Sequence, residues 1–184
     1  MGQVNRLILG TYMDPINVGL YTVSDTIARL STFFLVAFNS IFAAMISELY
    51  HTGDTDTLSR MYADITRWIV SLTLPLTIWI LVYSGRILSI FGKEYEVAKL
   101  VLALLVVSQF VNAAVGSNSF MLAMTKYQKL VLINGILVAG LNIGLNILLI
   151  PKLGIIGSAI GSMLAISSVN IVKTVEVYLA LRMI

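Results

Sequence analysis

The fold of this chain is decided by the stretch from Leu130 to Val172, which reads LVLINGILVAGLNIGLNILLIPKLGIIGSAIGSMLAISSVNIV. Its only charged residue is Lys152, which lies in a short Pro-Lys-Leu-Gly turn near the middle. A helix that crosses a bilayer needs about 20 consecutive, mostly apolar residues. The stretch is long enough for two of them, with the turn residues between. It therefore predicts two membrane-spanning helices, 130–151 and 153–172.

Three further apolar runs have the length of a span. They cover residues 21–47, 68–85 and 100–125. Residues 55–66 differ, because their apolar side chains recur at the spacing of one helix face, which predicts an amphipathic helix lying in the membrane interface. The sequence thus predicts an all-α fold, in which residues 1–184 form a single transmembrane bundle of about five spans.

Composition supports a membrane protein and argues against several other classes. Hydrophobic residues make up 58% of the chain and charged residues 11%, against about 25% charged in a typical soluble domain. The net charge of +3 is too small and too dispersed to favour a nucleic-acid partner, so the expected partner is the lipid bilayer. With no cysteine and one histidine, the chain is expected to hold no metal or cofactor and to have no catalytic residues.

Basic residues in the predicted loops give a weak indication of orientation. Five spans place Arg6, Arg86, Lys93 and Lys152 on one side, and Arg60, Arg67, Lys126, Lys129 and Arg182 on the other. Cytoplasmic loops carry an excess of lysine and arginine. The second side, which includes the C-terminus, is therefore expected to face the cytoplasm.

Two ionisable residues stand inside the first span. Asp25 and Arg29 are four residues apart, so they share a helix face and can form an ion pair. Ionisable groups at membrane depth are costly and usually face a protein interior or a water-filled cavity. One hypothesis is that Arg29 lines a substrate path, because a guanidinium binds phosphate oxygens well. The alternative is a purely structural ion pair near the membrane surface.

Neutral polar and small residues in the other spans provide further candidates. Gln109, Asn112 and Asn118 lie in the third run and are candidates to line a substrate path, although amides also form hydrogen bonds between helices. The last two spans have glycines at four-residue spacing, which favours close helix packing: Gly140, Gly144, Gly157 and Gly161.

Four runs together resemble a known family. They are VGLYTVSDTIARL (18–30), FGKEYEVA (91–98), QFVNAAVGSNSFMLAMTKYQK (109–129) and NIGLNILLIPKLGIIGSAIGSM (142–163). In this order they resemble the second lobe of polysaccharide flippases, the Wzx-type O-antigen and teichuronic-acid exporters of the multidrug/oligosaccharidyl-lipid/polysaccharide transporter superfamily. Members of that superfamily have two lobes, so the resemblance implies that this chain is a fragment that lacks its N-terminal partner lobe.

The resemblance also implies a function. Its substrate would be a lipid-linked glycan, an oligosaccharide on a polyprenyl pyrophosphate, carried from the cytoplasmic to the outer leaflet of the cell membrane. Access to a central cavity would alternate between the two lobes. It likewise implies a cytoplasmic C-terminus.

Three other functions remain open at this point. A multidrug/cation antiporter of the same superfamily would use Asp25 as its cation site. A membrane-bound glycan polymerase would be expected to need a large loop with catalytic residues, and no predicted loop is long enough. A non-catalytic membrane scaffold would have less use for spans so rich in amide side chains.

Overall fold

The computed structural model describes residues 2–181, which form helices and no strand. The elements in chain order are α1 (Gly2–Tyr12), α2 (Pro15–Ala28), the 3₁₀ turn η1 (Arg29–Thr32), α3 (Phe33–Thr52), α4 (Thr55–Val82), α5 (Ser84–Ser89), the 3₁₀ turn η2 (Lys93–Ala98), α6 (Lys99–Ala114), α7 (Asn118–Ala123) and α8 (Gln128–Leu181). The all-α fold class predicted from the sequence is confirmed.

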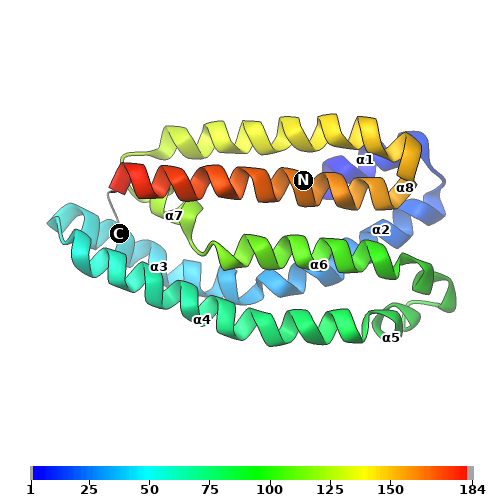
Figure 1. The fold of residues 1–184 in the computed structure, drawn as a ribbon, viewed down its shortest axis with the longest axis horizontal. Coiled ribbons are helices and arrows are strands. Elements are labelled where there is room, and N and C mark those ends of the chain that lie inside the picture. Colours follow the sequence, from blue (N-terminus) through cyan, green and yellow to red (C-terminus); the bar gives the residue numbers. More distant parts are fainter. Residues whose placement is uncertain (1, 182–184) are drawn as a thin grey trace.

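Four continuous helical segments in the described part of the chain are long and apolar enough to cross a membrane. They are Pro15–Thr52, Thr55–Val82, Lys93–Ala114 and Gln128–Ala180. The last one reverses direction at Gly154, whose φ of 58° and ψ of −137° are not helical, so α8 consists of two antiparallel halves (Figure 1). With these halves counted separately, the bundle has five long segments. The boundaries of the bilayer along them stay predictions.

The amphipathic segment 55–66 and the span 68–85 are not separate elements. Segment 55–66 and most of the span belong to α4, which runs without interruption from Thr55 to Val82, because no helix-breaking residue stands between the two segments. Ser84 and Gly85, at the end of the predicted span, belong to α5. The apolar face of 55–66 packs on the protein: Leu58 is fully buried in a cluster with Phe42 of α3 and Met121 of α7. This face is therefore covered by neighbouring helices.

The run 100–125 also differs from a single span. α6 ends at Ala114 and α7 begins at Asn118, and between them Gly116 has a φ of 68°, which glycine adopts without strain. A side chain at Gly116 would overlap the Thr66 hydroxyl of α4. The close approach of α4 to this backbone is a tertiary feature, and an apolar run does not indicate it.

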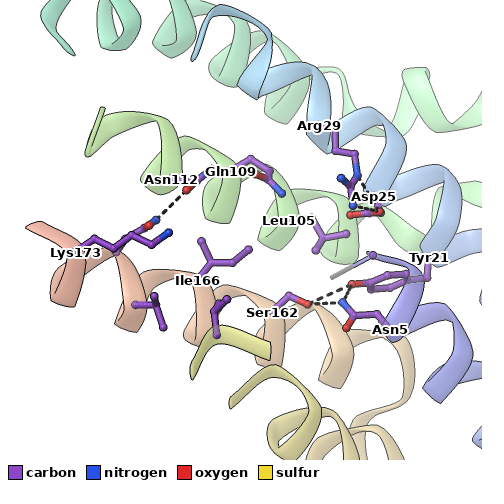
Figure 2. A pocket seen from close by; sticks show the side chains of 14 residues that line it. Asn5, Tyr21, Asp25, Arg29, Leu105, Gln109, Asn112, Ser162, Ile166 and Lys173 are labelled. Atoms are coloured by element: carbon purple, nitrogen blue, oxygen red, sulfur yellow. Dashed lines mark hydrogen bonds and ion pairs between the residues drawn. The ribbon is translucent and has the colours of Figure 1, made fainter. Parts of the chain in front are cut away.

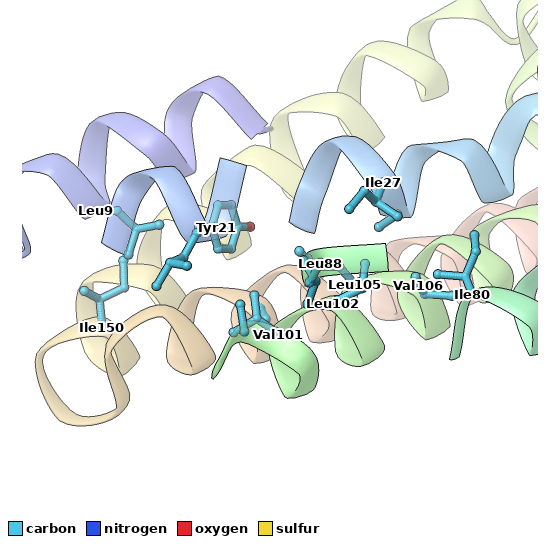
Figure 3. Packing of buried hydrophobic residues seen from close by; sticks show 14 residues of the cluster. Leu9, Tyr21, Ile27, Ile80, Leu88, Val101, Leu102, Leu105, Val106 and Ile150 are labelled. Atoms are coloured by element: carbon cyan, nitrogen blue, oxygen red, sulfur yellow. The ribbon is translucent and has the colours of Figure 1, made fainter. Parts of the chain in front are cut away.

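Residues 2–12 form a helix, α1, that is too short to have been predicted as a span. It packs against α2 and α8 and buries Leu9 completely. Leu9 belongs to the main apolar cluster, which also contains Leu102 of α6 and Ile150 of α8 (Figure 3). α1 thereby completes one wall of the polar site described below.

The outer surface of the bundle carries many large apolar side chains. Phe33 is 64% exposed, Trp68 61% and Leu148 66%, on three different helices. In contrast, several asparagine and serine side chains are fully buried between the helices. This arrangement, with apolar groups outside and polar groups inside, suits a protein surrounded by lipid.

Candidate functional site

The centre of the site is the carboxylate of Asp25, on the buried face of α2. Its side chain is 5% exposed, and one oxygen, Oδ2, accepts hydrogen bonds from Nε and Nη2 of Arg29 at 3.1 and 3.0 Å. Nη2 of Arg6, on α1, lies 3.4 Å from the same oxygen. The ion pair predicted for Asp25 and Arg29 is therefore present, and a second arginine joins it.

The two arginines differ in what they offer to a ligand. The Arg29 side chain is 53% exposed and lines a cavity, whereas Arg6 is 34% exposed and its Nε atom is buried without a hydrogen-bond partner among the described residues. Arg29 keeps part of its guanidinium available, since only two of its three nitrogens contact Asp25. It is therefore the arginine that an anion in the cavity would meet.

A network of neutral polar groups forms the floor beside this cluster (Figure 2). Asn5 Nδ2 of α1 donates to Tyr21 OH of α2 at 2.8 Å and to Ser162 Oγ of α8 at 2.7 Å. Asn142 Nδ2 reaches the same serine oxygen at 3.2 Å, and Asn146 Nδ2 donates to Asn5 Oδ1 at 3.3 Å. These bonds join α1, α2 and both halves of α8, and they hold the floor of the site in place.

The opposite wall comes from α6 and the second half of α8. Asn170 Nδ2 donates to Asn112 Oδ1 at 3.1 Å. Gln109 and Lys173 line the cavity too, both half-buried. No hydrogen bond joins either of them to another described residue, and the Lys173 ammonium interacts electrostatically with Glu176, three residues further along α8. Their polar ends are therefore available to a ligand.

Together these walls form a partly open cavity of about 270 Å³. The charged residues that line it are Asp25, Arg29 and Lys173, and the Asp25 carboxylate is shared with Arg6. The cavity thus has a surplus of positive charge. A polar, cationic cavity between apolar-surfaced helices favours an anionic ligand that also carries hydrogen-bonding groups.

The structure brings most of the predicted path residues together. Asp25, Arg29, Gln109 and Asn112 all line this cavity. Asn118 lies instead in a second pocket, where Nδ2 donates to Thr174 Oγ1 at 2.9 Å and Oδ1 is within hydrogen-bond reach of Tyr62 OH. The polar atoms of Asn118 are already engaged, although their contribution to a substrate path stays a prediction.

Several residues of the site were not predicted from the sequence: Asn5, Arg6, Tyr21, Ser162, Asn170 and Lys173. Arg6 was assigned to a loop, and Lys173 lies just beyond the end of the last apolar run. A charged residue next to an apolar segment would have been the available signal for both. Only the packing of α1 and α8 against α2 and α6 brings these groups to one place.

The four glycines expected to support packing fall into two pairs. A side chain at Gly157 would overlap the Leu149 carbonyl oxygen, and one at Gly161 would lie 3.3 Å from Leu145 Cβ, so the two halves of α8 approach closely there. At Gly140 and Gly144, apart from the adjoining residues and the helix's own nearby backbone, no described atom lies within 4 Å of such a side chain. This second pair has no packing contact within residues 2–181.

Metal ligation finds no support in the described residues, which contain no group of three or more histidine, cysteine, aspartate or glutamate side chains suited to a metal ion. Apart from the Asp25 carboxylate, the polar groups of the cavity are guanidinium, ammonium, amide and hydroxyl groups. These are donors to anions and to hydroxyl-rich ligands.

Comparison with known proteins identifies the family. Neither the curated proteins nor the solved structures gave a match. A family model described as polysaccharide biosynthesis protein matches residues 1–100, more than half of the 184 residues. That range contains α1, α2 and the Asp25 cluster. The chain is a member of this family of polysaccharide biosynthesis proteins.

Proposed function

We propose that this protein is one lobe of a transporter that flips polyprenyl-pyrophosphate-linked oligosaccharide across the cytoplasmic membrane. The flipped oligosaccharide would serve the biosynthesis of a cell-surface polysaccharide such as O-antigen. The observation that carries the proposal is the cationic cavity, in which Arg29 is about half exposed while its partner Asp25 is almost fully buried. The family membership and the resemblance to flippases support it.

The charged groups suit the pyrophosphate of such a substrate. Arg29 and Lys173 stand on different walls of the cavity, on η1 and α8 (Figure 2). A guanidinium donates in a fork that fits phosphate oxygens, and a lysine ammonium supplies a point charge. Asp25 acts as a positioning residue, because it accepts hydrogen bonds from two nitrogens of Arg29 and leaves the third nitrogen available.

The amide groups suit the sugars. Gln109 has no partner among the described residues, and Asn112 uses only its oxygen, so its Nδ2 is available as a donor. Sugar hydroxyls both donate and accept hydrogen bonds, as amides do. We therefore place the sugar end of the substrate toward the α6 side of the cavity, where Asn112 lies.

A second lobe completes this proposal. Carriers with two lobes expose a central site to alternate sides of the membrane. The present chain supplies one wall of such a site, and its partner would be the N-terminal lobe of the same transporter. Expression of this chain alone in a flippase-deficient strain should not restore surface polysaccharide. Restoration would overturn the proposal of a single lobe.

The competing functions receive less support. A cation antiporter needs an accessible carboxylate, and Asp25 is buried and shared by two arginines. A glycan polymerase would be expected to need a large loop with catalytic residues, and the described helices are joined by short connections. We propose transport without covalent chemistry at this site.

The test is binding of lipids that differ only in their head. The purified chain in lipid nanodiscs is titrated with a polyprenyl diphosphate and with the uncharged polyprenyl alcohol. The diphosphate should bind more tightly. Arg29→Ala and Lys173→Gln should each weaken its binding about tenfold, which corresponds to about 1.4 kcal/mol. Arg29→Lys should recover part of the loss, since an ammonium cannot reproduce the fork.

The control is Lys152→Gln, an exposed residue at the reversal of α8, which should leave binding unchanged. Equal affinity for the alcohol and the diphosphate would contradict the proposal, as would unchanged diphosphate binding by the folded Arg29→Ala variant.

A further inference from the structure

A second pocket lies where α6 gives way to α7. It measures about 220 Å³, and its floor is the non-helical backbone of Val115, Gly116 and Ser117. The Tyr62 hydroxyl, on α4, is 2.8 Å from the Val115 carbonyl oxygen and fixes this backbone. Non-helical backbone at membrane depth is tolerated where it is buried or lines a polar cavity.

The chemistry of this pocket differs from that of the first cavity. The side chains that line it are neutral amides, hydroxyls and apolar groups, and the polar ones include Asn39, Asn112, Ser117, Asn118 and Asn170. None of them carries a charge. The pocket is therefore unsuited to a phosphate and suited to an uncharged, hydroxyl-rich group.

Two buried polar side chains in this pocket have unused hydrogen-bonding capacity. Asn39 is 6% exposed and its Oδ1 atom has no partner among the described residues, and the same holds for Oγ of Ser117, which is 1% exposed. They come from α3 and from the α6–α7 break. Buried polar groups are normally paired, and an exception calls for an explanation such as a missing ligand.

The second pocket adjoins the cationic cavity. Asn112 and Asn170 line both, and the hydrogen bond between them forms a shared wall. A substrate whose charged head lies near Arg29 could thus extend past this wall into the neutral pocket. A cationic cavity that adjoins a neutral, polar pocket matches a substrate in which a phosphate group is followed by sugars.

We propose that the pocket at the α6–α7 break is a subsite for a sugar ring, bound by Asn39 and Ser117. This inference rests on the proposed function and adds the location and chemistry of sugar recognition. Rotation of the Asn39 amide exchanges its nitrogen and oxygen, so the group can donate to or accept from a sugar hydroxyl. Ser117 offers the same two options from the α6–α7 break.

The experiment compares two probes on the full chain in lipid nanodiscs. One is a polyprenyl diphosphate, and the other is the same lipid carrying one N-acetylhexosamine. The sugar-bearing lipid should bind about tenfold more tightly, as expected for two additional hydrogen bonds. Asn39→Ala and Ser117→Ala should each reduce this difference several-fold and leave binding of the sugar-free lipid unchanged.

The matched control is Ser108→Ala. Ser108 is also a fully buried serine without a hydrogen-bond partner among the described residues, and it lines neither pocket. It should change neither affinity. Ser117→Ala removes a single oxygen atom, so it keeps the test usable if Asn39→Ala does not fold.

The outcomes separate the subsite from the proposed function. Equal binding of both probes by the wild-type chain, or equal weakening of both by Ser117→Ala, would overturn the subsite. Arg29→Ala should weaken both probes, because both carry the diphosphate. If it weakens neither while the sugar-bearing lipid is still preferred, the proposed role of the cationic cavity fails and the sugar subsite stands.

Discussion

At the scale of single residues, Asp25 is the most constrained charged group of the site. It lies almost fully buried beside two arginines, so its removal would leave two guanidinium groups facing each other near a buried surface. A buried ion pair that loses one member is strongly destabilised, since the remaining charge is uncompensated. Asp25 is thus expected to affect stability as well as ligand binding.

Asp25→Asn should lower the free energy of unfolding by about 1–3 kcal/mol. This loss is smaller than that from breaking a fully buried ion pair, because Arg29 is half exposed and its charge is screened by solvent. Melting followed by circular dichroism measures the change. Adding Arg6→Met to Asp25→Asn should recover part of the loss, since one surplus cation leaves with the carboxylate.

The control is Asp64→Asn, which breaks an exposed ion pair with Arg67 at 3.4 Å. Exposed pairs contribute little, so its melting temperature should hardly move. If the Asp64 and Asp25 variants lost the same amount of melting temperature, the Asp25 ion pairs would contribute no more to stability than an exposed pair.

At the scale of elements, the reversal of α8 depends on close contact between its two halves. Gly154 provides the turn, and Gly157 lets the second half lie against the Leu149 carbonyl group. Small residues permit this kind of backbone approach between membrane helices.

Gly157→Ala should therefore destabilise the protein by about 1–3 kcal/mol, the usual range for overpacking. Gly140→Ala is the matched control on the same element, since its added methyl group meets no described atom within 4 Å beyond the adjoining residues and the helix's own nearby backbone. It should be neutral or stabilise α8 slightly, because alanine favours helix more than glycine does. Equal melting temperatures for the two variants would contradict the close contact.

The start of α4 is held by an N-cap. Asp54 accepts a hydrogen bond from the Thr57 backbone N–H at 3.0 Å, and this bond lowers the pKa of the Asp54 carboxyl below its ordinary value of 3.8. A carboxyl group whose pKa is lowered by folding adds stability above its unfolded-state pKa. That stability is lost as the pH falls through the lower folded-state pKa.

Asp54→Asn provides the test, because asparagine also caps helices but does not titrate. Melting temperatures are measured for both proteins as the pH is lowered from neutral to below about 4. The wild-type protein should lose more stability than the variant over the acidic part of that range. Parallel curves would mean that the cap does not contribute through its charge.

At the scale of the whole molecule, the connections gather at the two ends of the bundle (Figure 1). The structure corrects one assignment in the orientation argument: Arg6 is part of α1 and contacts Asp25, so it is not a loop residue. Without it, three basic residues oppose five, of which Arg182 lies outside the described residues. Arg60 and Arg67 likewise lie in a helix, α4, so the charge bias stays a weak indication, and a cytoplasmic α3–α4 connection and C-terminus stay predictions.

Cysteine labelling tests this orientation, and the absence of native cysteine makes it clean. In intact cells, Thr55→Cys at the start of α4 should not react with an impermeant thiol reagent added outside. Lys93→Cys, at the other end of the bundle, should react. The reverse pattern would show that the orientation is inverted.

The sequence by itself determined the membrane character, the all-α class and the reversal near Gly154, because hydrophobic length and turn residues are local properties of the chain. It also paired Asp25 with Arg29, since residues four apart share a helix face. Hydrophobic length, turn residues and four-residue spacing all depend only on residues that are close together in the sequence.

Only the tertiary structure decided the composition of the site. Arg6 reaches Asp25 from α1, and Lys173 of α8 lines the same cavity as Arg29, so distant parts of the chain meet there. The break at Gly116 likewise follows from the close approach of Thr66 on α4. A lipid-exposed side chain and a cavity-lining one can look alike in sequence, and helix packing distinguishes them because it fixes which face of each helix points inward.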